Sequence, residues 1–407
     1  MKQVLDGVKV VEVAMWWFVP AAGGILADWG ADVIKVEHPE TGDPQRALMT
    51  SGLIPNTGGV NFMMEQSNRG KRSVGLDLAT DGGRELLYEL CKDADVFLTN
   101  FLAPARQRLQ IDVEHIRAVN PDIVYARGTG QGPNGPDADK GGYDAASFWS
   151  RGGIAQALTK PGSEEPVMQR AAFGDSMGAM TVAGGIAAAL FGREKHGEPS
   201  VVDISLLGTA MWVLAPDIVS SKLLEGTGKS AIPSFGRKGS PNPIMNTYRT
   251  KDDRWLLLNM LQPDPYWADF CRHIDREDLI DDPKFSDGMK RFENSRECIA
   301  ILDEVFASRT LDEWREALET LEGVWAPMQS ALEIHDDPQA QANGYLPELE
   351  TAEGTPFRLV ANPVQFDEDS PALRTAPDHG EQTDEVLQEL GLDMDQIMEH
   401  KISGAVL

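Results

Sequence analysis

A short acidic motif is the strongest candidate for covalent chemistry. Phe173-Gly174-Asp175-Ser176 precedes the run Gly178–Phe191, whose many glycines and alanines predict a closely packed, buried helix. An aspartate at a helix start commonly caps it by accepting a backbone N–H. The same carboxylate can instead act as a nucleophile, where Gly174 and Gly178 let a substrate come close and the first helical N–H groups stabilise negative charge. Spacing alone leaves both interpretations open.

A basic cluster, Asn68-Arg69-Gly70-Lys71-Arg72-Ser73, is the second candidate site, because it is the densest group of positive charges in an acidic chain. It is either a solvated loop or a site at the mouth of a parallel sheet that holds a phosphorylated ligand. Arg106 and Arg108 follow a predicted strand, and ligands collect at the carboxyl ends of such strands. We therefore expect these two arginines beside the cluster.

The sequence does not support a dinucleotide-binding, metal-binding or serine-nucleophile motif. Gly130-x-Gly132-x-x-Gly135 has the spacing of a dinucleotide fingerprint, but Pro133 and Pro136 remove N–H donors and no helical pattern follows. The histidines and cysteines show no metal-ligand spacing, so no metal is expected. No GxSxG elbow occurs either. The aromatic run Trp16-Trp17-Phe18, by contrast, falls in a predicted strand–helix loop and is expected to line a pocket.

Alternating strand and helix patterns position these residues. Strands are predicted at Val8–Ala14, Ala31–Glu37, Ser73–Leu78, Asp95–Asn100 and Asp122–Arg127, and helices at Pro20–Gly30, Asp81–Asp93 and Val113–Val119. Helix-length connections between strands favour right-handed crossovers and a parallel sheet. The sequence therefore predicts an α/β fold whose large domain is a doubly wound, Rossmann-like sheet.

Composition shifts suggest the domain boundaries. We expect the first part of the large domain over residues 1–220, a linker rich in glycine, serine and proline over 221–240, and a smaller α+β domain over 241–330. The small domain begins with a predicted hairpin of Ile244–Thr250 and Trp255–Asn259. Residues 331–407 are expected to form a return linker and the C-terminal part of the large domain, with a helix in 381–392 that packs back on it.

Charge and composition exclude several classes of protein. The 407 residues include 64 Asp and Glu against 37 Lys and Arg, a formal net charge of −27. A field of that sign repels phosphate backbones and anionic bilayers, so neither nucleic acid nor membrane is expected as a partner. There is no long apolar stretch, no signal-peptide pattern at the N-terminus, and only three widely spaced cysteines. We expect a cytoplasmic enzyme or binding protein.

Eight segments together carry a family resemblance: LDGVKVVEVA, GADVIKVEHPETGDPQR, NRGKRSVGLDL, ADVFLTNF, YARGTGQGPNGP, GGYDAAS, GDSMGAM and HGEQTDEVLQELGL. In this order they resemble the family III CoA-transferases of the CaiB/BaiF type, a group that also contains alpha-methylacyl-CoA racemases. The resemblance covers nearly the whole chain. It is greatest to transferases that act on aromatic or branched 2-hydroxy acids.

The resemblance implies an enzyme that moves CoA between an acyl-CoA thioester and a free carboxylic acid. Asp175 falls on the family's catalytic aspartate, which forms a mixed anhydride and then an aspartyl-CoA thioester. An ionised Asp175 is required, so a low pKa is expected, and backbone N–H groups near Gly174–Gly178 are the candidates for an oxyanion site. No permanently bound cofactor is implied, CoA and acyl-CoA being substrates, and the family forms interlocked homodimers.

The resemblance also places contacts to CoA on a set of positions along the chain. They are Trp17, Phe18, His38, Leu76, Asp77, Asn100, Phe101, Arg108, Tyr143 and Asp144. The cluster Arg69–Arg72, and Arg72 in particular, is expected to anchor the nucleotide end of CoA. His38 stands where many relatives carry arginine.

One departure bears on the reaction type. Racemases of the family carry a histidine just before the aspartate of GGYDAAS, where this sequence has Tyr143. A phenol, with a pKa normally near 10, is a poor base at neutral pH, and moving an alpha proton needs two matched acid–base groups. This residue favours a transferase, and an acyl-CoA racemase or isomerase is the alternative.

Overall fold

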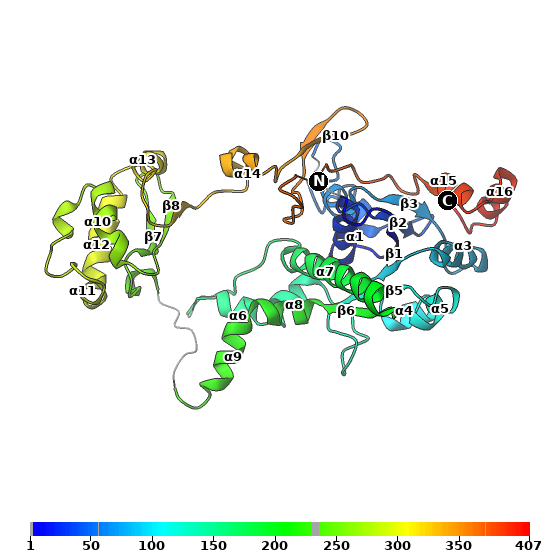
Figure 1. Cartoon of the computed structure of the whole chain (residues 1–407), viewed down its shortest axis with the longest axis horizontal. Helices are drawn as coiled ribbons and strands as arrows, with labels where there is room; N and C mark the ends of the chain where they lie inside the picture. The colour runs from blue at the N-terminus through cyan, green and yellow to red at the C-terminus, as the bar shows by residue number, and fades with distance from the viewer. Residues whose placement is uncertain (1–2, 56, 161, 229–235, 371) are drawn as a thin grey trace. The chain divides into compact units, whose positions relative to one another are not determined.

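The computed structural model describes residues 3–55, 57–160, 162–228, 236–370 and 372–407 (Figure 1). The chain divides into two compact units, Met1–Val219 with Pro338–Leu407, and Ser220–Asp337. The expected linker, 221–240, includes residues 229–235, which lie outside the described residues. Before them, α9 (Ala215–Leu223) runs into the expected linker, and after them comes the short helix η3 (Arg237–Gly239).

The first unit is built on a six-stranded parallel sheet with the strand order β3-β2-β1-β4-β5-β6. Its strands are β1 (Lys9–Val13), β2 (Asp32–Glu37), β3 (Arg72–Gly75), β4 (Val96–Thr99), β5 (Val124–Thr129) and β6 (Val201–Ser205). The order reverses between β1 and β4, which leaves a crevice above their carboxyl ends. This sheet confirms the predicted doubly wound, Rossmann-like architecture.

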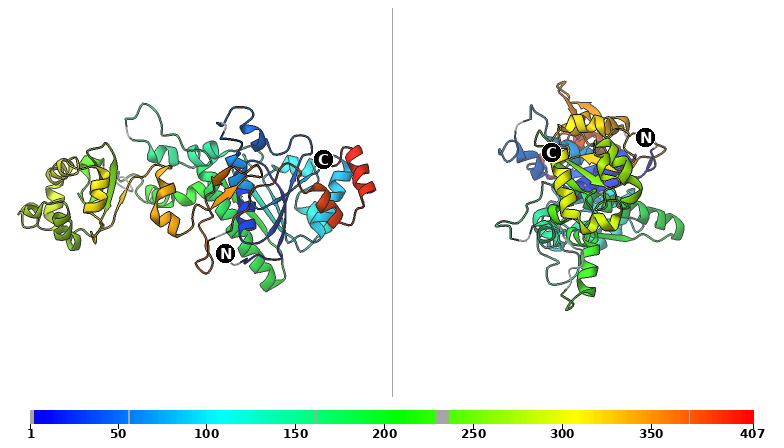
Figure 2. Two further views of the ribbon diagram at one scale, coloured as in Figure 1. Left: turned by 90° about the horizontal axis from the view of Figure 1, so that it is seen from above. Right: turned by 90° about the vertical axis from the view of Figure 1, so that its left-hand side faces the viewer.

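Helices cover both faces of this sheet (Figures 1 and 2). One face packs against α1 (Phe18–Asp28) and α7 (Phe173–His196), through a core that includes Val10, Val33 and Val96. The other face packs against α3 (Asp81–Lys92), α5 (Val113–Val119) and α15 (Thr383–Glu389). Consecutive strand residues such as Val10 and Val11 enter opposite cores, as the alternation of side chains in a strand requires.

Alanine and glycine fill the face of α7 that meets α1, where Ala179 and Ala183 are buried. The C-terminal helix α15 returns to the core through Val386 and Leu387, as expected from its amphipathic pattern. Shorter elements complete the unit: η1 (Pro44–Leu48), α2 (Phe62–Asn68), α4 (Ala103–Arg108), the π-helix η2 (Asp144–Ser150), α6 (Ile154–Leu158), α8 (Leu206–Val213), α14 (Pro338–Ala342), β10 (Glu348–Glu350), β11 (Pro356–Arg358) and α16 (Met394–Ile402).

The second unit has a three-stranded antiparallel sheet, β7-β8-β9. The predicted hairpin is present as β7 (Met245–Arg249) and β8 (Trp255–Asn259), and β9 (Trp325–Pro327) adds an edge strand that the sequence pattern did not reveal. Its helices are α10 (Asp264–His273), η4 (Glu277–Leu279), α11 (Gly288–Glu293), α12 (Ser295–Phe306), α13 (Leu311–Ala317) and η5 (Glu333–Asp336). Within the described residues, no helix is long and apolar enough to cross a membrane.

Candidate active site

Asp175 lies in the first turn of α7 but does not cap that helix. The helix begins at Phe173, after Ala172 in the left-handed conformation with φ 57°, so Asp175 is its third residue. The cap comes from another segment: the Gly174 N–H donates to both carboxylate oxygens of Asp144 at 3.1 Å. The capping interpretation of Asp175 is therefore wrong, because Asp144 fulfils that role at the start of η2.

Asp144 is one of the residues expected to contact CoA, and in the structure its carboxylate caps α7. Its residue surface is only 7% exposed, and its carboxylate faces the α7 backbone. The Gly174 N–H is thus occupied, and the Ser176 N–H donates to the Ala172 carbonyl at 2.9 Å. These bonds remove two of the N–H groups expected to form an oxyanion site.

The two glycines that flank Asp175 make room for aromatic packing. A Cβ on Gly174 would lie 2.2 Å from the Phe148 ring and 2.5 Å from the nearest Asp144 oxygen, and one on Gly178 would lie 2.4 Å from the Phe18 ring. Contacts that short cannot exist. Both glycines are buried, so they bring the helix close to Phe148 and Phe18 and do not open a path for substrate.

The pKa of Asp175 was expected to be low, but in the structure it is raised. Burial, followed by the negative charge of Asp144, raises the pKa of Asp175 to about 7. The dipole of the long helix α7 favours the ionised form, but it does not overcome these two effects. Asp175 is consequently poised to change its charge near neutral pH, as a tuned catalytic carboxyl group does.

Asp175 faces a cavity of about 400 Å³ at the carboxyl end of the sheet. The walls come from the segments that follow β1, β4, β5 and β6, and they are mainly apolar or backbone. They consist of Met15, Trp16, Phe18, Asn100, Phe101, Leu102, Ala105, Arg108, Gly128, Thr129, Gly130, Gly141, Gly142, Tyr143, Asp175 and Leu206. This cavity is called the Asp175 cavity below.

A second cavity, of about 380 Å³, lies over the ends of β1, β2 and β3. Its lining includes His38, Asp77 and Arg108, together with the segment Thr41–Pro44 and Leu76. It shares Met15, Phe101 and Arg108 with the Asp175 cavity. The two hollows therefore adjoin along the sheet edge, on either side of the strand-order reversal where open α/β sheets bind ligands.

Most of the residues expected to contact CoA line these two cavities. Phe18, Asn100 and Tyr143 lie in the Asp175 cavity, His38, Leu76 and Asp77 in the second one, and Phe101 and Arg108 in both. Trp17, also expected to contact CoA, donates its indole N–H to the Ser176 hydroxyl at 3.1 Å and is not among the residues that line the two cavities. The neighbouring Trp16 lines the wall in its place.

The basic cluster is placed differently from the prediction. Arg72 begins β3 and is therefore at the amino end of that strand, where it pairs with Asp32 and Glu389. Arg69 pairs with Asp28 at 2.7 Å and Lys71 with Glu12 at 2.7 Å, all four buried. Neutralised in this way and absent from the lining of both cavities, the cluster does not form the expected phosphate anchor.

Of the two arginines after β4, only one is available to a ligand. Arg106 is buried, pairs with Asp112 and donates to the Phe101 carbonyl at 2.6 Å. Arg108 is exposed and reaches both cavities. Residues 130–143 form no helix, in agreement with the argument against a dinucleotide fingerprint.

Comparison with known proteins gives the context of this site. The profile of CoA-transferase family III matches residues 5–383. The (R)-2-hydroxy-4-methylpentanoate CoA-transferase of Clostridioides difficile is 32% identical over 404 residues, covering 99% of each chain. The cinnamoyl-CoA:phenyllactate CoA-transferase of Clostridium sporogenes is 32% identical over 402 residues, covering 97% of this chain and 95% of that protein.

A solved structure supports the same conclusion. A CaiB/BaiF family protein from Brucella suis superposes with a TM-score of 0.81 and 29% identity, covering 96% of this chain and 100% of that one. The chain is thus a CoA-transferase, an enzyme of a class that uses CoA thioesters as substrates. It belongs to CoA-transferase family III.

Proposed function

We propose that CoA transfer proceeds through covalent catalysis by Asp175, between an acyl-CoA donor and a free carboxylic acid acceptor. The observation that carries this proposal is a carboxylate without a capping role, in a largely apolar cavity at the binding edge of the sheet. Its raised pKa fits a group whose charge is used in a reaction. Phe101 and Arg108, common to both cavities, mark the path along which an extended thioester would lie.

The steps balance without ATP or a metal ion. An Asp175 oxygen attacks the thioester carbonyl, and the C–S bond breaks to give a mixed anhydride and CoA thiolate. The thiolate attacks the aspartyl carbonyl, which gives an aspartyl-CoA thioester and releases the donor acid as its carboxylate. The acceptor carboxylate attacks that thioester and expels the thiolate, which then attacks the new acyl group to form the product acyl-CoA and regenerate Asp175.

Trapping the covalent enzyme tests this mechanism. Enzyme incubated with an acyl-CoA is quenched with acid, digested and examined by mass spectrometry, with and without hydroxylamine, which converts an activated aspartyl group to a hydroxamate. We expect the modification on the peptide that contains Asp175. Asp175→Ala is expected to lose CoA exchange while still binding CoA. Turnover by that variant, or an unmodified Asp175 peptide from the active enzyme, would refute the proposal.

The alternative within the family, racemisation or isomerisation of an acyl-CoA, needs a base at the alpha carbon. The position where the family's racemases carry histidine is occupied by Tyr143, which lines the Asp175 cavity and is 66% exposed, and a phenol does not replace the imidazole of a matched acid–base pair. Incubation of an acyl-CoA in deuterium oxide without an acceptor acid separates the two reactions. Deuterium at the alpha carbon supports the isomerase, and none supports the transferase.

We also propose that the enzyme is a cytoplasmic homodimer. Large apolar side chains on α8 and in the N-terminal part of α9 are exposed, namely Met211, Trp212 and Val219, and exposed apolar side chains of this kind are typical of a protein interface. Cys91, Cys271 and Cys298 are free thiols, which fits a reducing compartment. Sedimentation equilibrium tests the assembly, and a monomeric mass across micromolar concentrations would contradict it.

A further inference from the structure

The loop between β1 and α1 forms one wall of the Asp175 cavity in a strained conformation. Trp16 has φ 69°, in the left-handed region that costs a side chain other than glycine about 1 kcal/mol. Its indole lines the Asp175 cavity and meets the Tyr143 ring edge to face, with ring centroids 6.3 Å apart. The surrounding structure must hold this loop, because an unsupported tryptophan would leave such a conformation.

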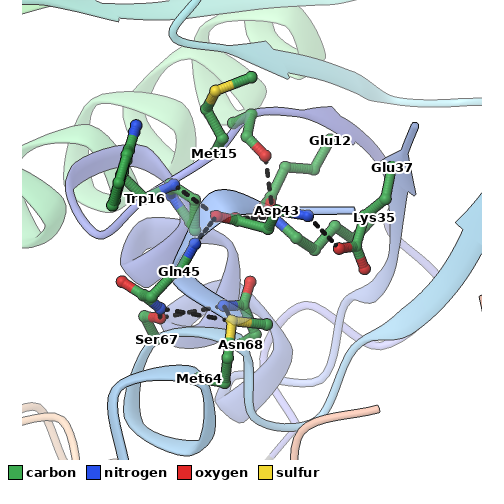
Figure 3. Close-up of polar contacts among 12 residues, drawn as sticks. Glu12, Met15, Trp16, Lys35, Glu37, Asp43, Gln45, Met64, Ser67 and Asn68 are labelled. Atoms are coloured by element: carbon green, nitrogen blue, oxygen red, sulfur yellow. Dashed lines mark hydrogen bonds and ion pairs between the residues drawn. The ribbon is translucent and has the colours of Figure 1, made fainter. Parts of the chain in front are cut away.

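Three side chains from other segments hold the loop by its backbone. The Trp16 N–H donates to Asp43 Oδ1 at 3.1 Å, and Lys35 Nζ donates to the Ala14 carbonyl at 2.8 Å. Asn100 accepts from the Met15 N–H at 3.1 Å and donates to the Met15 carbonyl at 2.6 Å. Figure 3 shows the Trp16 nitrogen facing the Asp43 carboxylate while its ring points away from Asp43.

Asp43 is itself fixed on both carboxylate oxygens. Oδ1 also accepts from the Gln45 N–H at 3.0 Å, and Oδ2 lies 2.9 Å from Lys35 Nζ. The side chains of Asp43 and Lys35 are both fully buried. Burial alone lowers the pKa of Lys35, but the charges of Asp43, Glu12 and Glu37 outweigh it and raise that pKa above its ordinary value. The ammonium therefore stays charged and keeps the Asp43 carboxylate in place.

We propose that Asp43 is a positioning residue: held in place by the buried ammonium of Lys35, it fixes the strained backbone of Trp16 and so sets one wall of the Asp175 cavity. Asp43 is among the residues that line the second cavity but not among those that line the Asp175 cavity, and its contact with the wall of the Asp175 cavity is the hydrogen bond from Trp16. This inference rests on the proposed function, because it assigns Asp43 a part in the reaction at Asp175. Asp43 is not one of the residues expected to contact CoA.

Asparagine at position 43 cannot reproduce this geometry. If its carbonyl oxygen faces the Trp16 and Gln45 N–H groups, its NH₂ group faces the Lys35 ammonium; if it flips, the NH₂ group faces those N–H groups. Asp43→Glu keeps the charge beside Lys35 but moves the acceptor by one methylene. Both variants should release Trp16, and the second keeps the test informative if the first does not fold.

The experiment has a spectroscopic arm that needs no activity. The enzyme is labelled with 5-fluorotryptophan, and the ¹⁹F line of Trp16 is assigned by its loss in Trp16→Phe. We expect Asp43→Asn and Asp43→Glu to shift or broaden that line. Asp28→Asn is the matched control, since it breaks another buried ion pair of the same unit, with Arg69, without touching the loop, and it should leave the Trp16 line in place.

The kinetic arm measures kcat and KM for acyl-CoA in the same variants. A wall displaced by about 1 Å can cost up to about 100-fold, and we expect Asp43→Asn to lower kcat/KM at least tenfold, mainly through kcat, against less than twofold for Asp28→Asn. In a Trp16→Gly background, Asp43→Asn should lower kcat/KM little further, because the Trp16 side chain that Asp43 positions is already absent.

An unmoved Trp16 line in both Asp43 variants, or additive losses in the double variant, would overturn the positioning role. If the active wild-type enzyme forms no adduct on Asp175, the proposed function fails instead, and the fluorine spectra decide separately whether Asp43 holds the loop.

Discussion

Replacing Asp144 by asparagine should move the pH dependence of CoA transfer to lower pH. The pKa of Asp175 is raised from 3.8 to about 7, first by burial and second by the charge of Asp144. Asparagine removes that charge but retains an oxygen that can accept the Gly174 N–H, so the cap of α7 survives. Because burial is the larger cause, most of the elevation should remain, and we expect the apparent pKa to fall by about one pH unit.

The consequence is largest in acid. With a pKa of about 7, about 3% of Asp175 is ionised at pH 5.5, and a pKa of about 6 raises that fraction about eightfold, whereas at pH 7 the gain is less than about twofold. The measurement is kcat/KM for label exchange between an acyl-CoA and its free acid, from pH 5 to 9 at constant ionic strength. The wild-type rate should rise through about pH 7 to a plateau.

The controls separate charge from capping. Asp393→Asn alters a capping carboxylate on α16, which lines neither cavity, and should leave the profile unchanged. Asp144→Ala loses the cap as well as the charge, so it should shift the profile like Asp144→Asn while lowering stability by about 1 kcal/mol. An Asp144→Asn profile that coincides with wild type, or moves to higher pH, would refute the reasoning.

Three further predictions concern stability and binding. Between about pH 4 and 7 the native enzyme holds a proton on Asp175 that the unfolded chain has lost, so the contribution of Asp175 to stability falls as pH rises. Relative to wild type, Asp175→Asn should therefore be more stable by about 1–2 kcal/mol at pH 8 and equally stable near pH 4, measured by calorimetry. Arg108→Ala should raise KM for acyl-CoA about tenfold, whereas Arg72→Ala should leave it within about twofold and lower the melting temperature. Deleting residues 404–407 should raise the Kd for CoA, since Ala405 and Leu407 hold the backbone of β3 and Asp77, and calorimetric titration with an unchanged Kd would contradict this.

The fold was predictable because its signals are local. The β-branched run of β1 predicts a strand and the leucine spacing of α3 predicts a helix, each within a few residues. The alternation of strands and helices along the chain then predicts a parallel sheet. The edge strand β9 was missed because it has only three residues and gains its structure by pairing with β8.

The basic cluster was misplaced although the sequence held the signal to place it correctly. Arg69–Arg72 precede the predicted strand Ser73–Leu78, and in a parallel sheet residues before a strand lie at its amino end, away from the binding edge. Arg108 follows a strand and lies at that edge. Whether an arginine precedes or follows its strand, rather than the local density of positive charge, decides whether it lies at the ligand-binding edge of the sheet.

The role of Asp144 had no local signal, because its partner is 30 positions away. Had Asp175 capped α7 itself, its oxygens would be engaged by backbone N–H groups, and such bonds lower a carboxyl pKa and weaken the nucleophile. With the cap supplied from η2, Asp175 lies in the first turn of the helix, where burial and a like charge disfavour its ionised form. The Asp144 carboxylate therefore both caps α7 and raises the pKa of Asp175, which leaves the Asp175 oxygens free to react. For this reason we expect that neither aspartate can take over the role of the other.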